Sequence, residues 1–375
     1  MRRPLVCAAT TLVLVEAFLG ASSGVFGMDG GLWATQLREA EGLNFTGEYR
    51  RALNKYQELL SASRVRQEVE IQAYVLSQMA DARIELGTYA DAKANAREAV
   101  ALLTRINRTH SGLFAIVQGV LATALRVEGN YSEAREAVQQ AVSLGKETLN
   151  TGSPRYSILL TYLALVSLDG GELRRCVELC RRAVAVFENA PGKNQIQLGS
   201  AYANLAVAYS LRGKPRKALS ALNLARTAWT QVLPTNHPFM VYALNTELQI
   251  CIQRKTFREA ERIAPELLRL GESRFGSHHP EFLILPNSAA ALHAAEKNYS
   301  EAEPFLREGV QIARQQFPAD HPTVRNMILN YSFILEMLNR KEEASLARAE
   351  GAVLLAFPTA RLPKRSQYPD GLATR

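Results

Sequence analysis

Three histidines form the most regular set of residues that could do chemistry. His237, His279 and His321 each stand immediately before a proline, and successive members are 42 residues apart. Side chains repeated at this distance lie on different structural units, whereas a metal needs ligands that meet at one point. Proline suits the first position of a helix, and a polar residue before it can cap that helix. We therefore interpret the three histidines as helix caps.

Other patterns have the composition of a chemical site but not its spacing. His278 and His279 with Glu281 could hold a metal only loosely, because adjacent residues face different ways and no H-E-x-x-H is present. Residues 20–24 match G-x-S-x-G but lack the strand-turn-helix context of a nucleophile elbow. No Walker A loop, dinucleotide-binding glycine pattern or credible catalytic triad is found. The sequence therefore predicts a protein that is not an enzyme and that needs no cofactor or metal. An enzyme remains an alternative only if its site has no recognisable motif.

The four cysteines do not have the spacing of a metal or redox site. Cys176 and Cys180 are four residues apart, Cys251 follows two repeats later, and Cys7 lies in the N-terminal segment. Zinc knuckles and thioredoxin-like sites use a C-x-x-C spacing instead. Cysteine also serves as a small hydrophobic residue in protein cores. We expect Cys176, Cys180 and Cys251 to be buried thiols, and the pattern leaves their redox state open.

Composition places the chain among folded proteins. Hydrophobic residues make up 47% and charged residues 21% of the 375 residues, which are ordinary globular values. The formal net charge is +8, but part of it comes from Arg361, Lys364, Arg365 and Arg375 near the C-terminus. Charges of both signs are interspersed elsewhere, whereas nucleic-acid binding usually shows a clustered basic face. We therefore expect no nucleic-acid partner.

The N-terminus has the layout of a secretory signal peptide. Arg2 and Arg3 form a short positive region, residues 4–15 carry no charge, and small residues follow at 20–24. Glu16 interrupts the apolar run before it reaches the roughly 20 residues that span a bilayer. We expect residues 1–24 to be a signal peptide that exports the chain to the periplasm or the extracellular space. The mature chain then has no membrane span; an uncleaved anchor or a chain that is not exported is the alternative.

Most of the remaining chain repeats with a period of 42 residues. Frames begin at residues 70, 112, 154, 196, 238, 280 and 322, and small residues recur within them. One column holds Ala92, Ala134, Cys176, Ala218, Ala260, Ala302 and Ala344. Turn glycines precede the first four of these: Gly87, Gly129, Gly171 and Gly213. Small side chains at fixed offsets let two antiparallel helices approach closely. Each repeat is therefore predicted to be a helix of about 15 residues, a tight turn and a second helix of similar length.

These features resemble the tetratricopeptide repeat (TPR), in the 42-residue form found in kinesin light chains. The resemblance covers about residues 31–357 and rests on residues 204–209 (Asn-Leu-Ala-Val-Ala-Tyr), the Gly213 turn, residues 298–302 (Asn-Tyr-Ser-Glu-Ala) and the His-Pro junctions. An earlier, atypical copy from about residue 31 to residue 63, identified by residues 47–49 (Gly-Glu-Tyr) and Ala52, brings the total to about eight repeats. The resemblance implies an all-α, right-handed superhelical solenoid of TPR repeats whose concave groove binds other polypeptides.

In TPR proteins the first helix of each repeat faces this groove. The residues predicted to line it are Tyr74, Gln78, Tyr162, Asn204, Tyr242, Asn245, Asn287 and Asn330. An asparagine carboxamide both donates and accepts, so a row of them can pair with the backbone of an extended peptide, and the tyrosines can anchor apolar groups. The row is not in strict register: Asn204 and Asn330 lie eight residues after the start of their frames (offset 8), whereas Asn245 and Asn287 lie seven residues after it (offset 7). The alternative is that these are solvated polar residues on a helix face.

The sequence thus predicts a non-enzymatic adaptor or scaffold that binds a protein or peptide segment in the groove. Self-association is the alternative, because Leu354, Leu355 and Phe357 in the last helix have no further repeat to cover them. Residues 358–375 have few apolar residues and a basic excess, and they are predicted to be a disordered tail.

Overall fold

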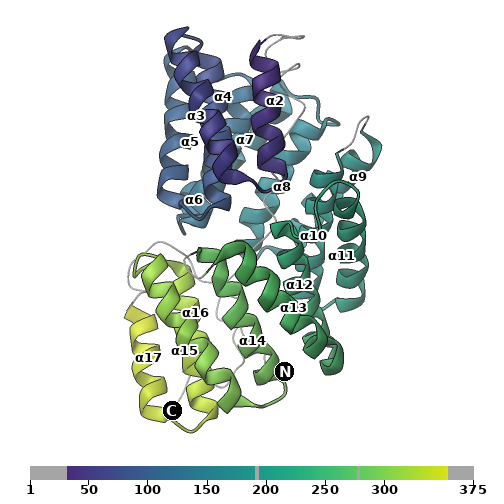
Figure 1. Ribbon diagram of the computed structural model, residues 1–375, viewed down its shortest axis with the longest axis vertical. Coiled ribbons are helices and arrows are strands. Elements are labelled where there is room, and N and C mark those ends of the chain that lie inside the picture. The colour runs from purple at the N-terminus through teal and green to yellow at the C-terminus, as the bar shows by residue number, and fades with distance from the viewer. Residues whose placement is uncertain (1–31, 191–193, 277–278, 354–375) are drawn as a thin grey trace. The chain divides into compact units, whose positions relative to one another are not determined.

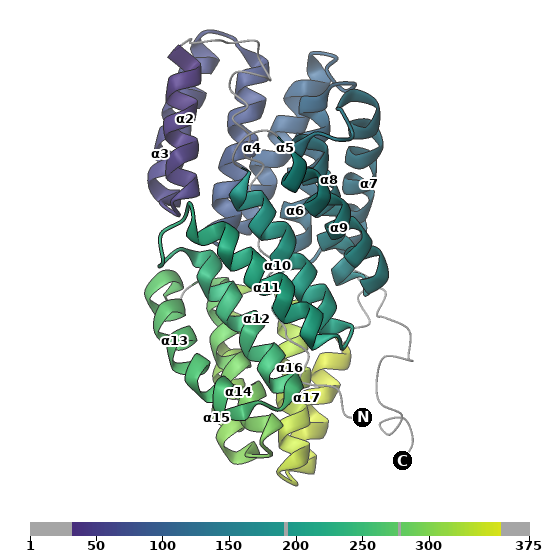
Figure 2. The same ribbon diagram turned by 90° about the vertical axis from the view of Figure 1, so that its right-hand side faces the viewer.

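The computed structural model describes residues 32–190, 194–276 and 279–353, and over these residues the chain is all-α, as predicted. The first helices of the repeats are α2 (Leu32–Phe45), α4 (Val69–Glu85), α6 (Gly112–Val127), α8 (Pro154–Asp169), α10 (Gln195–Leu211), α12 (Pro238–Arg254), α14 (Ile284–Ala295) and α16 (Pro322–Met337). The second helices are α3 (Tyr49–Val65), α5 (Tyr89–Arg105), α7 (Tyr131–Thr148), α9 (Leu173–Asn189), α11 (Pro215–Thr230), α13 (Phe257–Phe275), α15 (Tyr299–Gln316) and α17 (Lys341–Val353). Figure 1 and Figure 2 show these eight helical pairs. The predicted signal segment and basic tail lie outside the described residues.

The helices belong to two compact units, whose division falls within α10 and α11. The N-terminal unit holds the described residues up to 208 together with 223–237, and the C-terminal unit holds 209–222 together with the described residues from 238 onwards. In the N-terminal unit, α4, α6 and α8 each pack against the second helix of their own repeat, and α6 also contacts both α4 and α8. In the C-terminal unit, α12 contacts α13 and α14 in the same way. Within each unit, therefore, neighbouring first helices contact one another.

The turn between the two helices has the same backbone conformation in every frame. Gly87, Gly129, Gly171 and Gly213 have φ between 67° and 85°, and the equivalent residues in the last three frames are Lys255, Lys297 and Asn339 with φ between 58° and 69°. At the first of these turns the Thr88 N–H donates to the Arg83 carbonyl at 2.9 Å, which ends the helix in a Schellman motif. Glycine adopts this left-handed conformation without steric cost, whereas the other residues bear a small strain.

The predicted column of small residues lies in the core. Its members from Ala92 to Ala302 are 0% exposed, and Ala344 is 1% exposed. Two helices can approach closely at these positions because no long side chain separates them. The predicted helix-turn-helix repeat is therefore confirmed.

The sixth frame departs from the simple pattern of one continuous first helix. It begins with a 3-10 helix, η1 (Pro280–Leu283), and only then continues as α14. Pro286 explains the break, since proline has no N–H to donate inside a helix. Restarting the α-helix at Ile284 places Pro286 in the first turn, where that N–H is not needed.

Exposed ion pairs connect second helices of neighbouring repeats. Arg97 of α5 lies 3.1 Å from Glu133 of α7, and Arg314 of α15 lies 2.5 Å from Glu350 of α17. Exposed pairs of this kind contribute about 0–1 kcal/mol each. Cations on some second helices therefore face a carboxylate on the next repeat. Among the described residues, no helix is long and apolar enough to cross a membrane.

Candidate functional site

All eight residues predicted to line the groove lie on first helices and are buried. Asn204 is 0% exposed, and Asn245, the most accessible of the eight, is 6% exposed. They are therefore not the solvated polar residues of the alternative interpretation. Tyr74, Gln78, Tyr162 and Asn204 belong to the N-terminal unit, and the other four belong to the C-terminal unit.

In the C-terminal unit the predicted asparagines pair across successive first helices. Asn330 Nδ2 donates to Asn287 Oδ1 at 3.0 Å, which joins α16 to α14. The Ser288 hydroxyl donates to Asn245 Oδ1 at 2.5 Å, which joins α14 to α12. In both pairs the partners are 43 residues apart, one more than the repeat. The slip between offsets 7 and 8 is thus the register at which neighbouring first helices meet.

The same register is visible in the N-terminal unit as a packing contact. Gly119 of α6 and Tyr162 of α8 are also 43 residues apart, and a Cβ added at Gly119 would lie 2.6 Å from Tyr162 Cδ2. The Tyr162 ring therefore fills the space that a larger residue at position 119 would need. Ser288 and Gly119 were missed by the sequence analysis, although adding one residue to the period would have identified both.

Tyr74 takes part in a buried hydrogen bond that was not predicted. Its hydroxyl donates to Glu41 Oε1 of α2 at 2.6 Å, and Glu41 is 1% exposed. Burial raises the pKa of Glu41 to about 7, although the Tyr74 hydrogen bond and the nearby Arg38 favour the ionised form. Burial also raises the pKa of Tyr74. Glu41 lies in the atypical first copy of the repeat, where the 42-residue period gave no signal.

Gln78 and Tyr242 differ in their surroundings. Gln78 Nε2 is buried and has no hydrogen-bond partner among the residues that the structure describes. Gln78 follows Tyr74 by one turn of α4, so both lie on the same face of that helix. The Tyr242 ring packs against Phe275, with ring centroids 5.9 Å apart. Gln78 thus offers a buried donor, whereas Tyr242 belongs to an aromatic contact.

The histidines serve as helix caps, as predicted, at the two junctions whose caps are defined. His279 Nδ1 accepts from the Glu281 N–H and His321 Nδ1 accepts from the Thr323 N–H, each at 3.1 Å. The His321 ring also stacks on Phe317, with centroids 4.3 Å apart. Over the described ranges, no group of three or more His, Cys, Asp or Glu residues could hold a metal ion.

The three cysteines of the repeats are buried and free, as expected. A hydrogen bond from the Cys180 thiol to Cys176, together with burial, raises the pKa of Cys180 well above its usual value. Buried thiols with a raised pKa are poor nucleophiles. Leu354, Leu355 and Phe357, on which predicted self-association depends, lie outside the described residues, so that alternative stays a prediction.

The contact between Gly119 and Tyr162 can be tested with two glycine substitutions of opposite expected effect. Gly119→Ala should lower the free energy of unfolding by about 1–3 kcal/mol, because the new methyl group overlaps a ring that has no room to move. Gly42→Ala, in α2, has nothing within 4 Å of the added Cβ and should raise stability by about 0.5–1 kcal/mol. Denaturant unfolding of both variants measures the difference; equal effects would contradict the proposed register.

The buried Glu41 carboxyl predicts a pH dependence of stability. Between its ordinary value of 4.5 and its native pKa of about 7, the native chain holds a proton that the unfolded chain has released. Stability therefore falls as the pH rises through this window. Glu41→Gln removes this titration, so the variant should match the wild type at pH 4.5 and exceed it by up to about 3 kcal/mol at pH 8.

Glu39→Gln is the matched control for this prediction, since Glu39 lies on the same helix but is exposed and 3.3 Å from Lys55. It should change stability by less than about 1 kcal/mol at both pH values. Thermal melts at pH 4.5 and 8 provide the measurement. If the difference in stability between Glu41→Gln and the wild type were the same at both pH values, Glu41 would not be a buried proton-binding group.

Comparison with known proteins agrees with this geometry. The tetratricopeptide repeat family matches residues 155–231 with one of its profiles, and residues 116–155 and 287–323 with another. A kinesin light chain-related protein of Arabidopsis thaliana is 23% identical over 252 residues, which are 66% of this chain and 38% of that protein. A clustered mitochondria protein homolog of Aspergillus niger is 24% identical over 142 residues, 38% of this chain. The match spans only 11% of the length of that relative.

Solved structures of low sequence identity share the fold. A Rap protein complexed with competence and sporulation factor is 12% identical, with a TM-score of 0.59, and the match covers 86% of this chain and 97% of that one. The apo form of the quorum sensor NprR from B. thuringiensis is 11% identical, with a TM-score of 0.57. That match covers 86% of this chain and 87% of NprR. At these identities the likeness shows the fold alone. Together with the repeat frame and the paired helices, the matches show that this chain is a tetratricopeptide repeat protein with repeats of the kinesin light chain type.

Proposed function

We propose that the chain is a non-enzymatic adaptor that holds an extended polypeptide segment along its first helices. Tetratricopeptide repeats of the kinesin light chain type support a protein-interaction scaffold in general terms. The observation that carries the finer proposal is the 43-residue register, which sets two hydrogen-bonded pairs, Asn245–Ser288 and Asn287–Asn330, in a row over three first helices. A row of this kind provides regularly spaced donors and acceptors along the direction in which repeats stack.

The chemistry of this row suits a peptide backbone. A carboxamide has two N–H donors and a carbonyl with two lone pairs, so it can bond to a neighbouring repeat, as Asn330 does to Asn287, and also to a peptide backbone. Because these carboxamides are 0–6% exposed, a bound strand would reach them only when neighbouring side chains move aside; its own N–H and C=O groups would then replace the bonds between repeats. In the N-terminal unit, the buried Gln78 Nε2 would donate to a carbonyl of the partner. Such contacts would recognise the backbone of the partner peptide and would depend little on its amino-acid sequence.

One structural relative adds indirect support. The Rap protein whose fold is similar was solved in a complex with competence and sporulation factor. An array of this fold can therefore hold another molecule. We extend that capacity to this chain as part of the proposal, with a polypeptide as the partner.

Site-directed photo-crosslinking in the native host tests the proposal. The photoreactive residue para-azidophenylalanine at Gln249 of α12 or at Asn326 of α16 should crosslink to a partner polypeptide, because both positions lie on first helices and are only half-buried. Control positions are Val65 of α3, 84% exposed, and Leu346 of α17, 72% exposed, which lie on second helices. Mass spectrometry of the crosslinked products identifies the partner and the residues joined. Crosslinks confined to Val65 or Leu346 would contradict binding along the first helices.

Export remains part of the proposal, on the evidence of the N-terminal sequence. If the segment 1–24 is a cleaved signal peptide, the chain purified from its host should begin close to residue 24 and should be found outside the cytoplasm. N-terminal sequencing and cell fractionation measure both. A chain that begins at Met1 in the cytoplasmic fraction would overturn export.

A further inference from the structure

One stretch of the chain is basic without any compensating acid. None of the 36 Asp and Glu residues lies between positions 189 and 246, although this stretch covers a full repeat. Its six cations are Lys193, Arg212, Lys214, Arg216, Lys217 and Arg226. Elsewhere in the repeats, charges of both signs are interspersed. The fifth frame, which begins at residue 196, therefore differs from its neighbours in charge although it shares their fold.

Four of these cations gather at one turn of the C-terminal unit. We call Arg212, Lys214, Arg216 and Lys217 the basic turn; they flank Gly213 between α10 and α11. The last three are exposed, and no residue in the described part of the chain forms an ion pair with any of the four. Lys217 Nζ lies 6.0 Å from the centroid of the Tyr209 ring, a weak cation–π contact. The basic turn is thus an exposed group of cations without carboxylate partners.

The position of Lys217 makes this arrangement unfavourable for the fold itself. The equivalent frame position is acidic in five other repeats: Asp91, Glu133, Glu259, Glu301 and Glu343. A carboxylate in the first turn of a helix is stabilised by the positive end of the helix dipole, whereas a cation there is destabilised. In α9 the equivalent Arg175 is 3.2 Å from Glu172, which offsets that effect. In α11 no described carboxylate does so.

We propose that the basic turn is a docking surface for an acidic segment of a partner polypeptide. Carboxylates placed there would pair with Lys214, Arg216 and Lys217 and would also face the free N–H groups at the start of α11. The surface is separate from the row of carboxamides on the first helices, so it would provide a second point of attachment. A residue arrangement that opposes local stability is expected where a binding function has been gained.

The extent of the patch favours a polypeptide over a nucleic acid or a membrane. The cations occupy one turn and the start of one helix, whereas nucleic acids and anionic membranes are usually bound by longer basic faces. In the next frame of the same unit, Arg254 lies 3.9 Å from Glu259, so the basic character does not continue there. The ring of Tyr209 already faces Lys217, which leaves it poorly placed to stack on a base. A short run of Glu or Asp side chains matches this surface best.

Fluorescence anisotropy with the full chain tests the proposal. The probe is a fluorescein-labelled 12-residue peptide of Glu and Ser with an amidated C-terminus, in a buffer of low ionic strength. We expect saturable binding that weakens as salt is added. The triple variant Lys214→Gln/Arg216→Gln/Lys217→Gln should raise the Kd about tenfold or more. Its circular dichroism and melting temperature should not fall, since these side chains support no described contact of the core.

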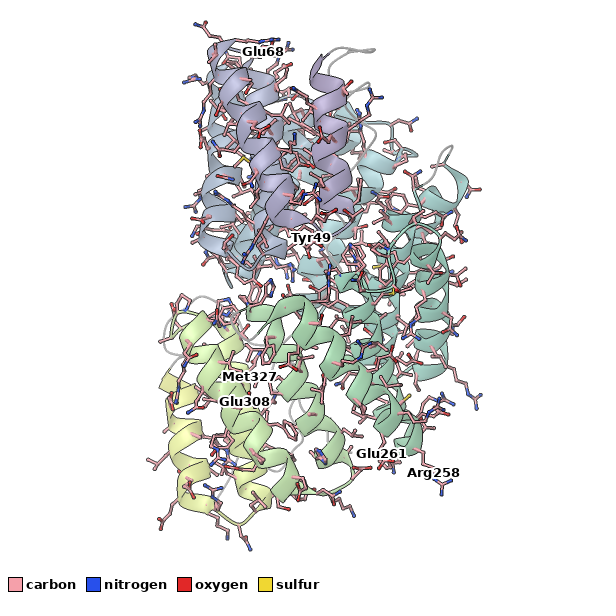
Figure 3. All side chains as sticks on the ribbon, in the orientation of Figure 1. Tyr49, Glu68, Arg258, Glu261, Glu308 and Met327 are labelled. Atoms are coloured by element: carbon pink, nitrogen blue, oxygen red, sulfur yellow. The ribbon has the colours of Figure 1, made fainter. Side chains whose placement is uncertain are left out.

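The matched control removes the same charge from α13 of the same unit. Arg258→Gln/Arg262→Gln/Arg269→Gln neutralises three exposed cations that are interspersed with Glu259, Glu261 and Glu266. Arg258 and Glu261 are labelled on this helix in Figure 3. This variant should leave the Kd of the peptide unchanged within a factor of about two, because its cations already have carboxylates nearby.

Three outcomes would overturn the proposal. The first is an equal loss of affinity in both triple variants, which would show that binding depends on the net charge of the chain and not on the basic turn. The second is the absence of peptide binding at low ionic strength. In the third, a 12-nucleotide single-stranded RNA or vesicles containing phosphatidylserine bind the wild type more tightly than the peptide does, and the Lys214→Gln/Arg216→Gln/Lys217→Gln variant loses that binding. That result would assign the basic turn to a nucleic acid or to a membrane surface.

Discussion

Close contact between the two helices of each repeat is the constraint on which the rest of the structure depends. One column of the frame holds alanine in six repeats and Cys176 in the other, and all seven side chains are 0–1% exposed. A larger side chain there would separate the helices, and a densely packed interior tolerates such overpacking poorly. Because a repeat buries its apolar face only against its neighbours, the spacing set by this column governs how each repeat meets the next.

The register between first helices follows from that stacking. Residues 43 positions apart meet, whether they form a hydrogen bond, as Asn287 and Asn330 do, or a packing contact, as Gly119 and Tyr162 do. A buried polar group without a partner is costly, so pairing between repeats is what allows carboxamides to occupy the interior of the array. The candidate site is therefore part of the contact that holds neighbouring repeats together.

Charge is arranged by a different rule on the second helices. Some cations there face a carboxylate one repeat away, as Arg97 faces Glu133, so that these charges are neutralised between repeats. The basic turn differs from the other described turns in its local composition, because frame five has no acid at all. Exposed charges cost the fold little, and this tolerance lets one repeat change its charge without changing its backbone.

Much of this protein was determined by its sequence alone, because a fixed period reports local geometry. The 42-residue frame, the small-residue column and the turn glycines predicted the paired helices, and the His-Pro junctions predicted the caps at His279 and His321. All of these depend on residues close together in the chain or at one repeated spacing. The break in the first helix near Pro286 was missed, because a pattern shared by seven frames does not report a proline that occurs at that position in one of them.

Only the tertiary structure decided which contacts the predicted groove residues make. Helix-to-helix register depends on side-chain packing between repeats, which no periodicity within one repeat specifies. The sequence showed that the asparagines shift from position 7 to position 8 of the frame, but only the structure shows that this shift places Asn287 beside Asn330. Likewise, the buried bond between Tyr74 and Glu41 joins a regular repeat to the atypical first copy. Contacts between segments of different period can be identified only once both have been placed in three dimensions.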